Sequence, residues 1–164
     1  VMAWVDRQVS TPALLRNWTT VWIGNLAGAL LIAAAISQTS LITGGFGTTA
    51  AKIAAGKMAL APLDIFVRAI LCNALVCLAV WLSFAATDVA GKILAIILPV
   101  AAFVALGLEH SIANMFLLPL GLMAGAEGSA ALAAQNIAIA TAGNILGGAG
   151  GVALAYRFAF KPQV

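Results

Sequence analysis

The side chains with the greatest chemical potential lie in one short run, Glu109 to Asn114 (EHSIAN), which interrupts a long apolar stretch. An acid, an imidazole, a hydroxyl and an amide this close together could bind a small polar solute or exchange a proton with it. If the apolar stretch crosses a membrane, Glu109 and His110 lie at a depth where an uncompensated charge costs at least about 2.5 kcal/mol. Both side chains must therefore face polar groups of the protein or water.

His110 has two interpretations. In the first, a break between two half-helices exposes the ring and nearby backbone N–H groups to a permeating anion, as helix N-termini do elsewhere. In the second, the ring is a hydrogen-bonded packing residue. We favour the first, because ionisable residues inside membranes usually serve a function. Ser111 could cap the second half-helix, Asn114 belongs to the same polar break, and Glu109 is expected to be structural, since it would repel an anion.

Other polar residues also have two interpretations each. Asn73 either supplies an amide hydrogen to a pathway or joins two helices by a hydrogen bond. The residue type and its position favour the second interpretation. Lys57 either attracts anions to an outer vestibule or is a solvated loop lysine, which is the commoner case. We interpret Asn25 and Asn144 as helix-packing or break-stabilising residues and not as anion ligands.

No pattern typical of an enzyme occurs in the sequence. It contains one histidine, no Cys/His spacing typical of a metal site, and neither of the glycine-rich motifs that bind dinucleotides or phosphates. We therefore expect no catalysis, no metal and no cofactor.

The composition indicates a membrane protein. Hydrophobic residues make up 63% of the 164 residues and charged residues only 8%, whereas soluble domains have about 25% charged residues. The net charge of +3 comes without any basic run, so nucleic acid is not expected as a partner. Cys72 and Cys77 are five positions apart in one apolar segment, on different helix faces, and we interpret both as small core residues.

The elements that position the polar residues are predicted to be spanning helices of a single transmembrane domain, because a span needs about 20 apolar residues. The third predicted span is too long for one crossing and is broken near 107–114, so two half-helices are expected there. The fourth is rich in glycine, which lets neighbouring backbones approach closely. The connection from Ser37 to Ala61 is expected to be a partly ordered surface loop. The domain covers 1–164, and the spans are predicted at about 14–36, 65–84, 93–122 and 137–155.

The distribution of positive charge predicts an orientation, because Lys and Arg accumulate in cytoplasmic loops. If successive loops lie on alternate sides of the membrane, the side that includes the C-terminus carries more basic residues than the other side. The C-terminus is therefore predicted to be cytoplasmic. The richer side has Arg7, Arg16, Lys92, Arg157 and Lys161, and the other has Lys52, Lys57 and Arg68.

An internal repeat links the first and last spans. The pattern N-x6-G-N-x2-G begins at Asn17 and recurs from Asn136, a constant offset of 119 residues. Two predicted spans lie between the two copies, which therefore have opposite orientations, as in the inverted repeats of many transporters and channels. The same offset places the partner of the Glu109–Asn114 break upstream of Val1, so we interpret the chain as truncated.

Four segments resemble the formate/nitrite transporter family, and the similarity extends from about Val1 to Phe160. The most specific is GLEHSIANMF, Gly107 to Phe116, which resembles the family signature. The others follow in the order that the family shows: NWTTVWIGNLAGALL (Asn17 to Leu31), LCNALVCLAVW (Leu71 to Trp81) and AGNILGG (Ala142 to Gly148).

The resemblance implies an all-α, aquaporin-like protomer of six helices, of which this chain would hold the third to sixth. The family assembles as a homopentamer in a bacterial or archaeal-type cell membrane, surrounded by lipids, and each subunit has a pore for small monovalent weak-acid anions such as formate or nitrite. The resemblance places the central pore histidine at His110, a hydrogen-bonding asparagine at Asn73, a vestibule lysine at Lys57 and a narrowing aromatic at Phe103.

Two departures from the family pattern affect the expected substrate preference. Leu108 stands where an aromatic residue is common, and the run from Asn136 to Asn144 lacks a proline that many members have before the threonine. Two alternative functions stay open. One is a neutral-solute or water channel of aquaporin type, although its N-P-A motifs do not occur, and the other is a membrane assembly subunit that transports nothing.

Overall fold

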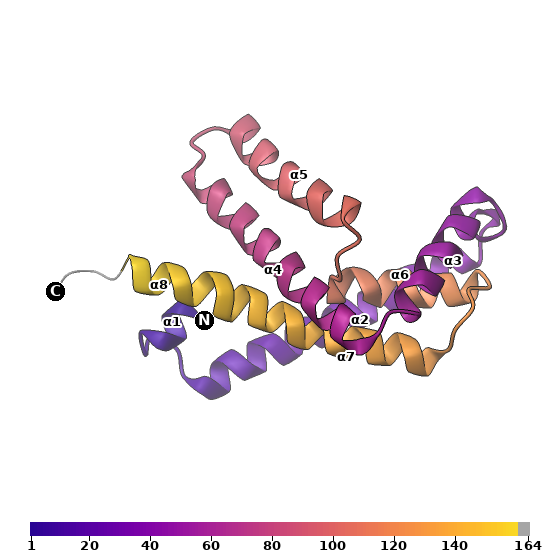
Figure 1. The fold of residues 1–164 in the computed structure, drawn as a ribbon, viewed down its shortest axis with the longest axis horizontal. Helices are drawn as coiled ribbons and strands as arrows, with labels where there is room; N and C mark the ends of the chain where they lie inside the picture. The colour runs from indigo at the N-terminus through magenta and orange to yellow at the C-terminus, as the bar shows by residue number, and fades with distance from the viewer. Residues whose placement is uncertain (161–164) are drawn as a thin grey trace.

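The structure, a computed structural model, describes residues 1–160 and consists of helices joined by short connections (Figure 1). This confirms the predicted all-α class. In chain order the elements are α1 (Met2–Val5), α2 (Thr11–Ser37), the 3-10 helix η1 (Ser40–Thr43), α3 (Gly45–Met58), α4 (Pro62–Ala85), α5 (Val89–Ala105), α6 (Ser111–Met123), α7 (Ala130–Ile145), the π-helix η2 (Leu146–Leu154) and α8 (Ala155–Ala159).

Three helices are long and apolar enough to cross a membrane: α2, α4 and the continuous segment α7–η2–α8, Ala130–Ala159. Their starts follow local rules. The Ser10 hydroxyl accepts a hydrogen bond from the Ala13 N–H at the start of α2, and Ser129 does the same for Leu132 at the start of α7. Such side-chain caps satisfy amides that the first turn of a helix leaves without partners.

A broken helix is present between α5 and α6. The chain leaves α5 after Ala105, turns at Gly107 in the left-handed region (φ +63°), and re-enters a helix at Ser111. Glycine takes up this backbone conformation without the steric penalty of a side chain. α5 folds back along α4, whereas α6 continues into the centre of the molecule (Figure 1).

The prediction of a partly ordered surface loop between Ser37 and Ala61 is wrong. Most of this connection is the α-helix α3, which packs against α6 and buries Ala50 and Ala54. The approach is close at Gly121 of α6, where an added Cβ would collide with the Ala54 side chain and lie 2.9 Å from the Ala50 carbonyl oxygen. Tertiary packing of small side chains therefore stabilises a helix that its Gly- and Thr-rich sequence disfavours.

Replacing Gly121 by alanine is expected to lower the free energy of unfolding by about 1 to 3 kcal/mol, because an overpacked contact forces the backbones apart. Thermal denaturation of the detergent-solubilised protein measures the effect. Gly56→Ala on α3 is the matched control, since no atom lies within 4 Å of its added Cβ. If both variants have the same melting temperature as the wild type, the close approach of α3 to α6 is absent.

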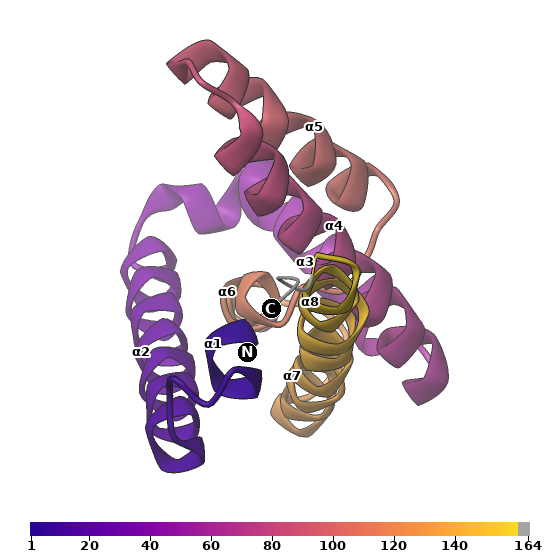
Figure 2. The ribbon, with the colours of Figure 1, turned by 90° about the vertical axis from the view of Figure 1, so that its left-hand side faces the viewer.

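The glycines of α7 and η2 bring this segment against α4. A Cβ at Gly143 would lie 2.6 Å from the Phe66 carbonyl oxygen, and one at Gly147 would collide with the backbone of Ile70. Figure 2 views the helices nearly end-on and shows α7 and α8 in one column on the opposite side of α6 from α2. The close approach of a neighbouring backbone that the glycine-rich sequence predicts is therefore present between this segment and α4.

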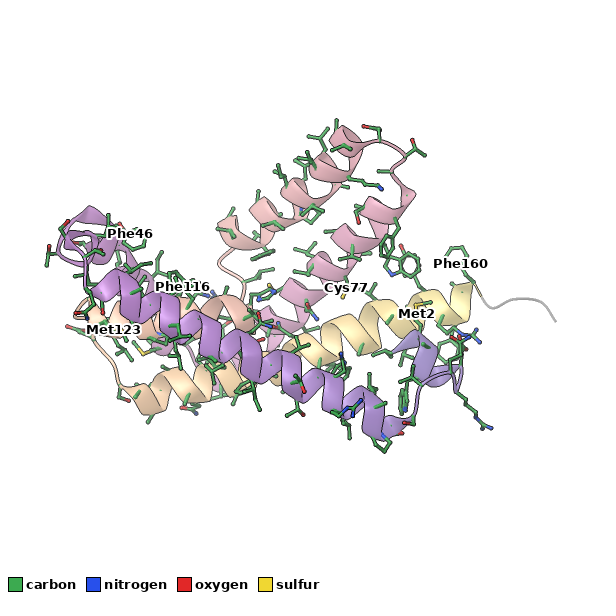
Figure 3. The ribbon with its side chains drawn as sticks, turned by 180° about the vertical axis from the view of Figure 1, so that it is seen from behind. Met2, Phe46, Cys77, Phe116, Met123 and Phe160 are labelled. Atoms are coloured by element: carbon green, nitrogen blue, oxygen red, sulfur yellow. The ribbon has the colours of Figure 1, made fainter. Side chains whose placement is uncertain are left out.

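The two repeat copies run in opposite directions, since α2 leads away from the end of the molecule that holds α1 and α7–η2–α8 returns to it (Figure 1). Figure 3 places Phe46 and Met123 at one end and Met2 and Phe160 at the other. Equivalent positions of the copies also meet. Trp22 donates its indole N–H to the Thr141 hydroxyl at 3.1 Å across a separation of 119 residues, which is the repeat offset.

Candidate functional site

The Glu109 carboxylate lies at the helix break and is fully buried. Lys57 Nζ lies 2.8 Å from Oε1, while Oε2 accepts hydrogen bonds from the amides of Asn114 at 2.6 Å and Asn136 at 3.3 Å. A buried carboxylate is tolerated when it is paired and hydrogen-bonded in this way. Glu109 therefore has protein partners for both oxygens, in the arrangement expected of a structural acid.

Lys57 lies in the last turn of α3, because the connection that contains it is helical. Its side chain is only 15% exposed, and Nζ also lies 3.4 Å from the Leu108 carbonyl oxygen. The alternative of a solvated loop lysine is wrong. Lys57 joins α3 to the break and compensates the charge of Glu109.

Asn144 of α7 fixes the backbone of the break. Its Oδ1 accepts the Ser111 N–H at 2.8 Å, and its Nδ2 donates to the carbonyls of Glu109 at 3.0 Å and Ala69 at 2.8 Å. Its repeat counterpart Asn25 differs, since among residues 1–160 its side chain donates only to the Val21 carbonyl of its own helix. The interpretation of Asn144 as a break-stabilising residue agrees with these contacts.

His110, and not Ser111, is the side-chain cap of the second half-helix. His110 is the N-cap residue of α6, and its Nδ1 accepts the Ala113 N–H at 3.3 Å. The expectation that Ser111 caps this helix is wrong, because Ser111 is already the first helical residue and its N–H is bound by Asn144. With Nδ1 occupied as an acceptor, a neutral ring carries its proton on Nε2.

The first turn of α6 leaves one backbone donor without a protein partner. The amides of Ser111, Ala113 and Asn114 bind Asn144, His110 Nδ1 and His110 O respectively. The Ile112 N–H makes no hydrogen bond to any of residues 1–160. It lies in the first turn of α6, at the positive end of the helix dipole. An anion is favoured at such a position.

A cavity of about 710 Å³ borders the break on the side of α2, α4 and η2. Of the residues singled out from the sequence, five lie together at its wall: Asn73, Cys77, His110, Ser111 and Asn144. Asn73 also donates to the Asn144 carbonyl at 2.6 Å, so it both lines the cavity and ties α4 to α7.

The remaining candidates lie outside the lining of this cavity. Lys57, Glu109 and Asn114 form the buried network behind the break. The Phe103 ring stacks on the His110 ring with 5.8 Å between centroids and 27° between planes. Phe103 therefore contacts the candidate site through the imidazole.

Three residues have roles that the sequence analysis missed. Cys77 is half-buried and lines the cavity, so its interpretation as a core residue is wrong, whereas Cys72 is fully buried. Arg68 bonds Asp64 at 2.7 Å and also reaches the Gly107 carbonyl at 3.4 Å. Asn136 binds Glu109, and its only signal in the sequence is its place as the first residue of the repeat pattern.

Comparison with protein families matches residues 1–158 to the model described as formate/nitrite transporter. The chain is 40% identical to a probable formate transporter of Methanothermobacter thermautotrophicus, over 97% of this chain and 64% of the relative. It is 42% identical to the uncharacterized transporter YrhG of Bacillus subtilis, over 99% of this chain and 61% of YrhG. It is 36% identical to the formate channel FocA of Escherichia coli, over 75% of this chain and 44% of FocA.

Solved structures give the same similarity. An FNT family ion channel superposes with a TM-score of 0.84 at 30% identity, covering 94% of this chain and 63% of that one. A pentameric formate channel with formate bound superposes with a TM-score of 0.79 at 34% identity, covering 90% of this chain and 66% of that one. The chain spans about three fifths of the length of the first two relatives.

Proposed function

Because this chain belongs to the formate/nitrite transporter family, we propose that it forms part of a channel for small monovalent weak-acid anions such as formate or nitrite, with His110 at the centre of the pathway. The observation that carries the proposal is the placement of the His110 ring and the first turn of α6 at the wall of the cavity. A ring N–H and an unpaired backbone N–H are donors suited to a carboxylate or nitrite oxygen.

The charge balance around the break favours an anion in the cavity. The negative charge of Glu109 would repel an anion, but Lys57 Nζ lies 2.8 Å from Glu109 Oε1 and compensates this charge. The amides of Asn114 and Asn136 bind the other carboxylate oxygen, Oε2. The donors at the start of α6 then act without competition from a free carboxylate. Glu109, Lys57 and Asn114 serve as supports of the site in this proposal, while Asn73, Ser111 and His110 line it.

Protonation of the solute lowers the barrier in the apolar parts of the pathway. An anion loses its hydration when it enters an apolar constriction, whereas the neutral acid crosses at far lower cost. The donor groups of His110 and of the first turn of α6, at the wall of a largely apolar cavity, mark the place where a weak-acid anion could take up a proton. Phe103, stacked on the His110 ring, would narrow the pathway beside it.

Assembly and orientation are proposed on the same basis. We expect a homopentamer in the cell membrane, because a similar solved chain is described as a pentameric formate channel. We expect the C-terminus to be cytoplasmic. Arg7, just after α1, and Arg157, on α8, lie at one end of the molecule, while Lys52 lies on α3 near the opposite end (Figure 1). Lys161, which the charge argument also uses, lies outside the described residues.

The test is solute flux into lipid vesicles that contain the full-length protein of which this chain is part. We expect formate to enter, and His110→Asn to reduce the rate about tenfold and to alter its pH dependence, because one hydrogen bond to a charged solute is lost. Gly56→Ala, away from the cavity, is the control. An unchanged rate and pH dependence in His110→Asn would reject the role of the ring. Glycerol entry without formate entry would indicate a neutral-solute channel, and no entry at all a scaffold.

A further inference from the structure

Gly148 lies where the π-helix η2 packs against α4. A Cβ added at this position would collide with the Asn73 amide nitrogen and lie 2.9 Å from Cys77 Sγ. Both approaches are closer than van der Waals contact allows, so an alanine here would displace at least one of the two side chains. The missing side chain of Gly148 therefore leaves Asn73 and Cys77 in the positions that they have.

The contact at Gly148 differs in kind from the contact at the preceding glycine. A Cβ at Gly147 would collide with the backbone of Ile70, so Gly147 allows the two helices to approach each other. At Gly148 the obstacle is a pair of side chains, Asn73 and Cys77, which lie one turn apart on the same face of α4. Gly148 therefore sets the space available to these side chains, whereas Gly147 sets the distance between the helices.

The Asn73 amide uses this space to reach the backbone of α7. Its Nδ2 donates to the Asn144 carbonyl oxygen at 2.6 Å, and the Asn144 side chain in turn binds the Ser111 N–H and the Glu109 carbonyl of the break. An amide nitrogen carries two hydrogens, and the bond to Asn144 uses one of them. The second hydrogen has no acceptor within residues 1–160, and Asn73 lines the cavity beside His110.

We propose that Gly148 is a positioning residue of the pathway, because the absence of a side chain there holds the Asn73 amide in one orientation, with one hydrogen on α7 and the other available to the solute. A methyl group in place of the Gly148 hydrogen would push the amide away from the Asn144 carbonyl, and the second donor would lose its orientation with that bond. The inference rests on the proposed function in giving Asn73 a role toward the transported anion. The contacts themselves join α4, α7 and η2, and they can be tested without transport.

The experiment is a double-variant cycle in the full-length protein, measured as formate entry into lipid vesicles. Gly148→Ala is expected to reduce the rate about tenfold and to raise the formate concentration at half-maximal rate, because one hydrogen bond to a charged solute is lost. In an Asn73→Ala background the displaced amide is absent, so adding Gly148→Ala should change the rate by less than about twofold. In a Cys77→Ala background the whole loss should remain. Gly151→Ala is the matched control in the same π-helix, since its added Cβ would lie 3.9 Å from the Leu146 carbonyl oxygen.

The melting temperature in detergent is a second readout that needs no transported solute. Gly148→Ala should lower it by about 2 to 10 °C, and the Asn73→Ala background should remove most of this shift. Equal loss of flux from Gly148→Ala with and without Asn73 would overturn the proposal, because the methyl group would then act by narrowing the pathway itself. Relief by Cys77→Ala and not by Asn73→Ala would overturn it as well. If the wild type admits no formate, the proposed function fails, while the melting temperatures still decide whether Gly148 positions Asn73.

Discussion

Replacing Asn144 by leucine is expected to lower the free energy of unfolding by about 3 kcal/mol or more, since two buried backbone groups of the break lose their partners at about 1 to 3 kcal/mol each. The N–H of Ser111 and the carbonyl of Glu109 are both bound by the Asn144 side chain. Leucine has a similar volume and can replace neither bond. The backbone between α5 and α6 would then rearrange, and the His110 ring with it.

The repeat supplies a matched control for this prediction. Asn25→Leu changes the equivalent residue of the first copy, whose side chain donates only to the Val21 carbonyl of its own helix and is partly exposed. Its effect on stability is expected to be within about 0.5 kcal/mol, as for other substitutions away from buried features. Thermal denaturation in detergent compares the two variants. Equal losses at both positions would show that Asn144 does not have the special role assigned to it.

The second large effect is expected at the buried ion pair behind the break. Glu109→Leu should destabilise the protein by about 3 to 5 kcal/mol, because Lys57 is left as an uncompensated, mostly buried charge. The amides of Asn114 and Asn136 each lose one of their two acceptors at the same time. The variant is expected to yield little folded protein, and what folds should show altered formate flux.

A double variant distinguishes charge compensation from the other contacts of Glu109. Adding Lys57→Met to Glu109→Leu removes the stranded charge, and it should recover a substantial part of the lost stability, as apolar replacements of buried pairs do. Glu109→Gln is the conservative comparison, since it keeps the shape and one acceptor oxygen. Stability is measured for all three variants by denaturation in detergent. If the double variant is no more stable than Glu109→Leu, the Lys57 charge is not the main cause.

Much of the fold could be predicted from sequence because the signals are local. The apolar composition indicates membrane helices, and the polar run after Gly107 marks the interruption that separates α5 from α6. Asn144 was predicted to be a helix-packing or break-stabilising residue, and its side chain binds the break at Ser111 and Glu109 and α4 at Ala69. These features depend on residue type and spacing within one or two helices.

The helix α3 could not be recognised by the same reasoning. Its glycines and threonines lower helix propensity, and its apolar content is below that of the spanning helices. It is stabilised by contact with α6, where Gly121 leaves room for Ala50 and Ala54. Without that partner surface in view, the segment has the composition of a loop, and Lys57 was assigned to a loop for the same reason.

By itself the sequence therefore determined the membrane class, the family resemblance and the position of the break, and it singled out His110 as a candidate within the break. Only the tertiary structure decided which charges meet: Lys57 with Glu109 across 52 residues, and Asp6 with Arg157 across 151. The physical reason is that helix formation and membrane burial are set by neighbouring residues. Pairing between distant side chains instead depends on how whole helices pack, and in this chain that packing is set by glycines at close contacts and by asparagines that join one helix to another.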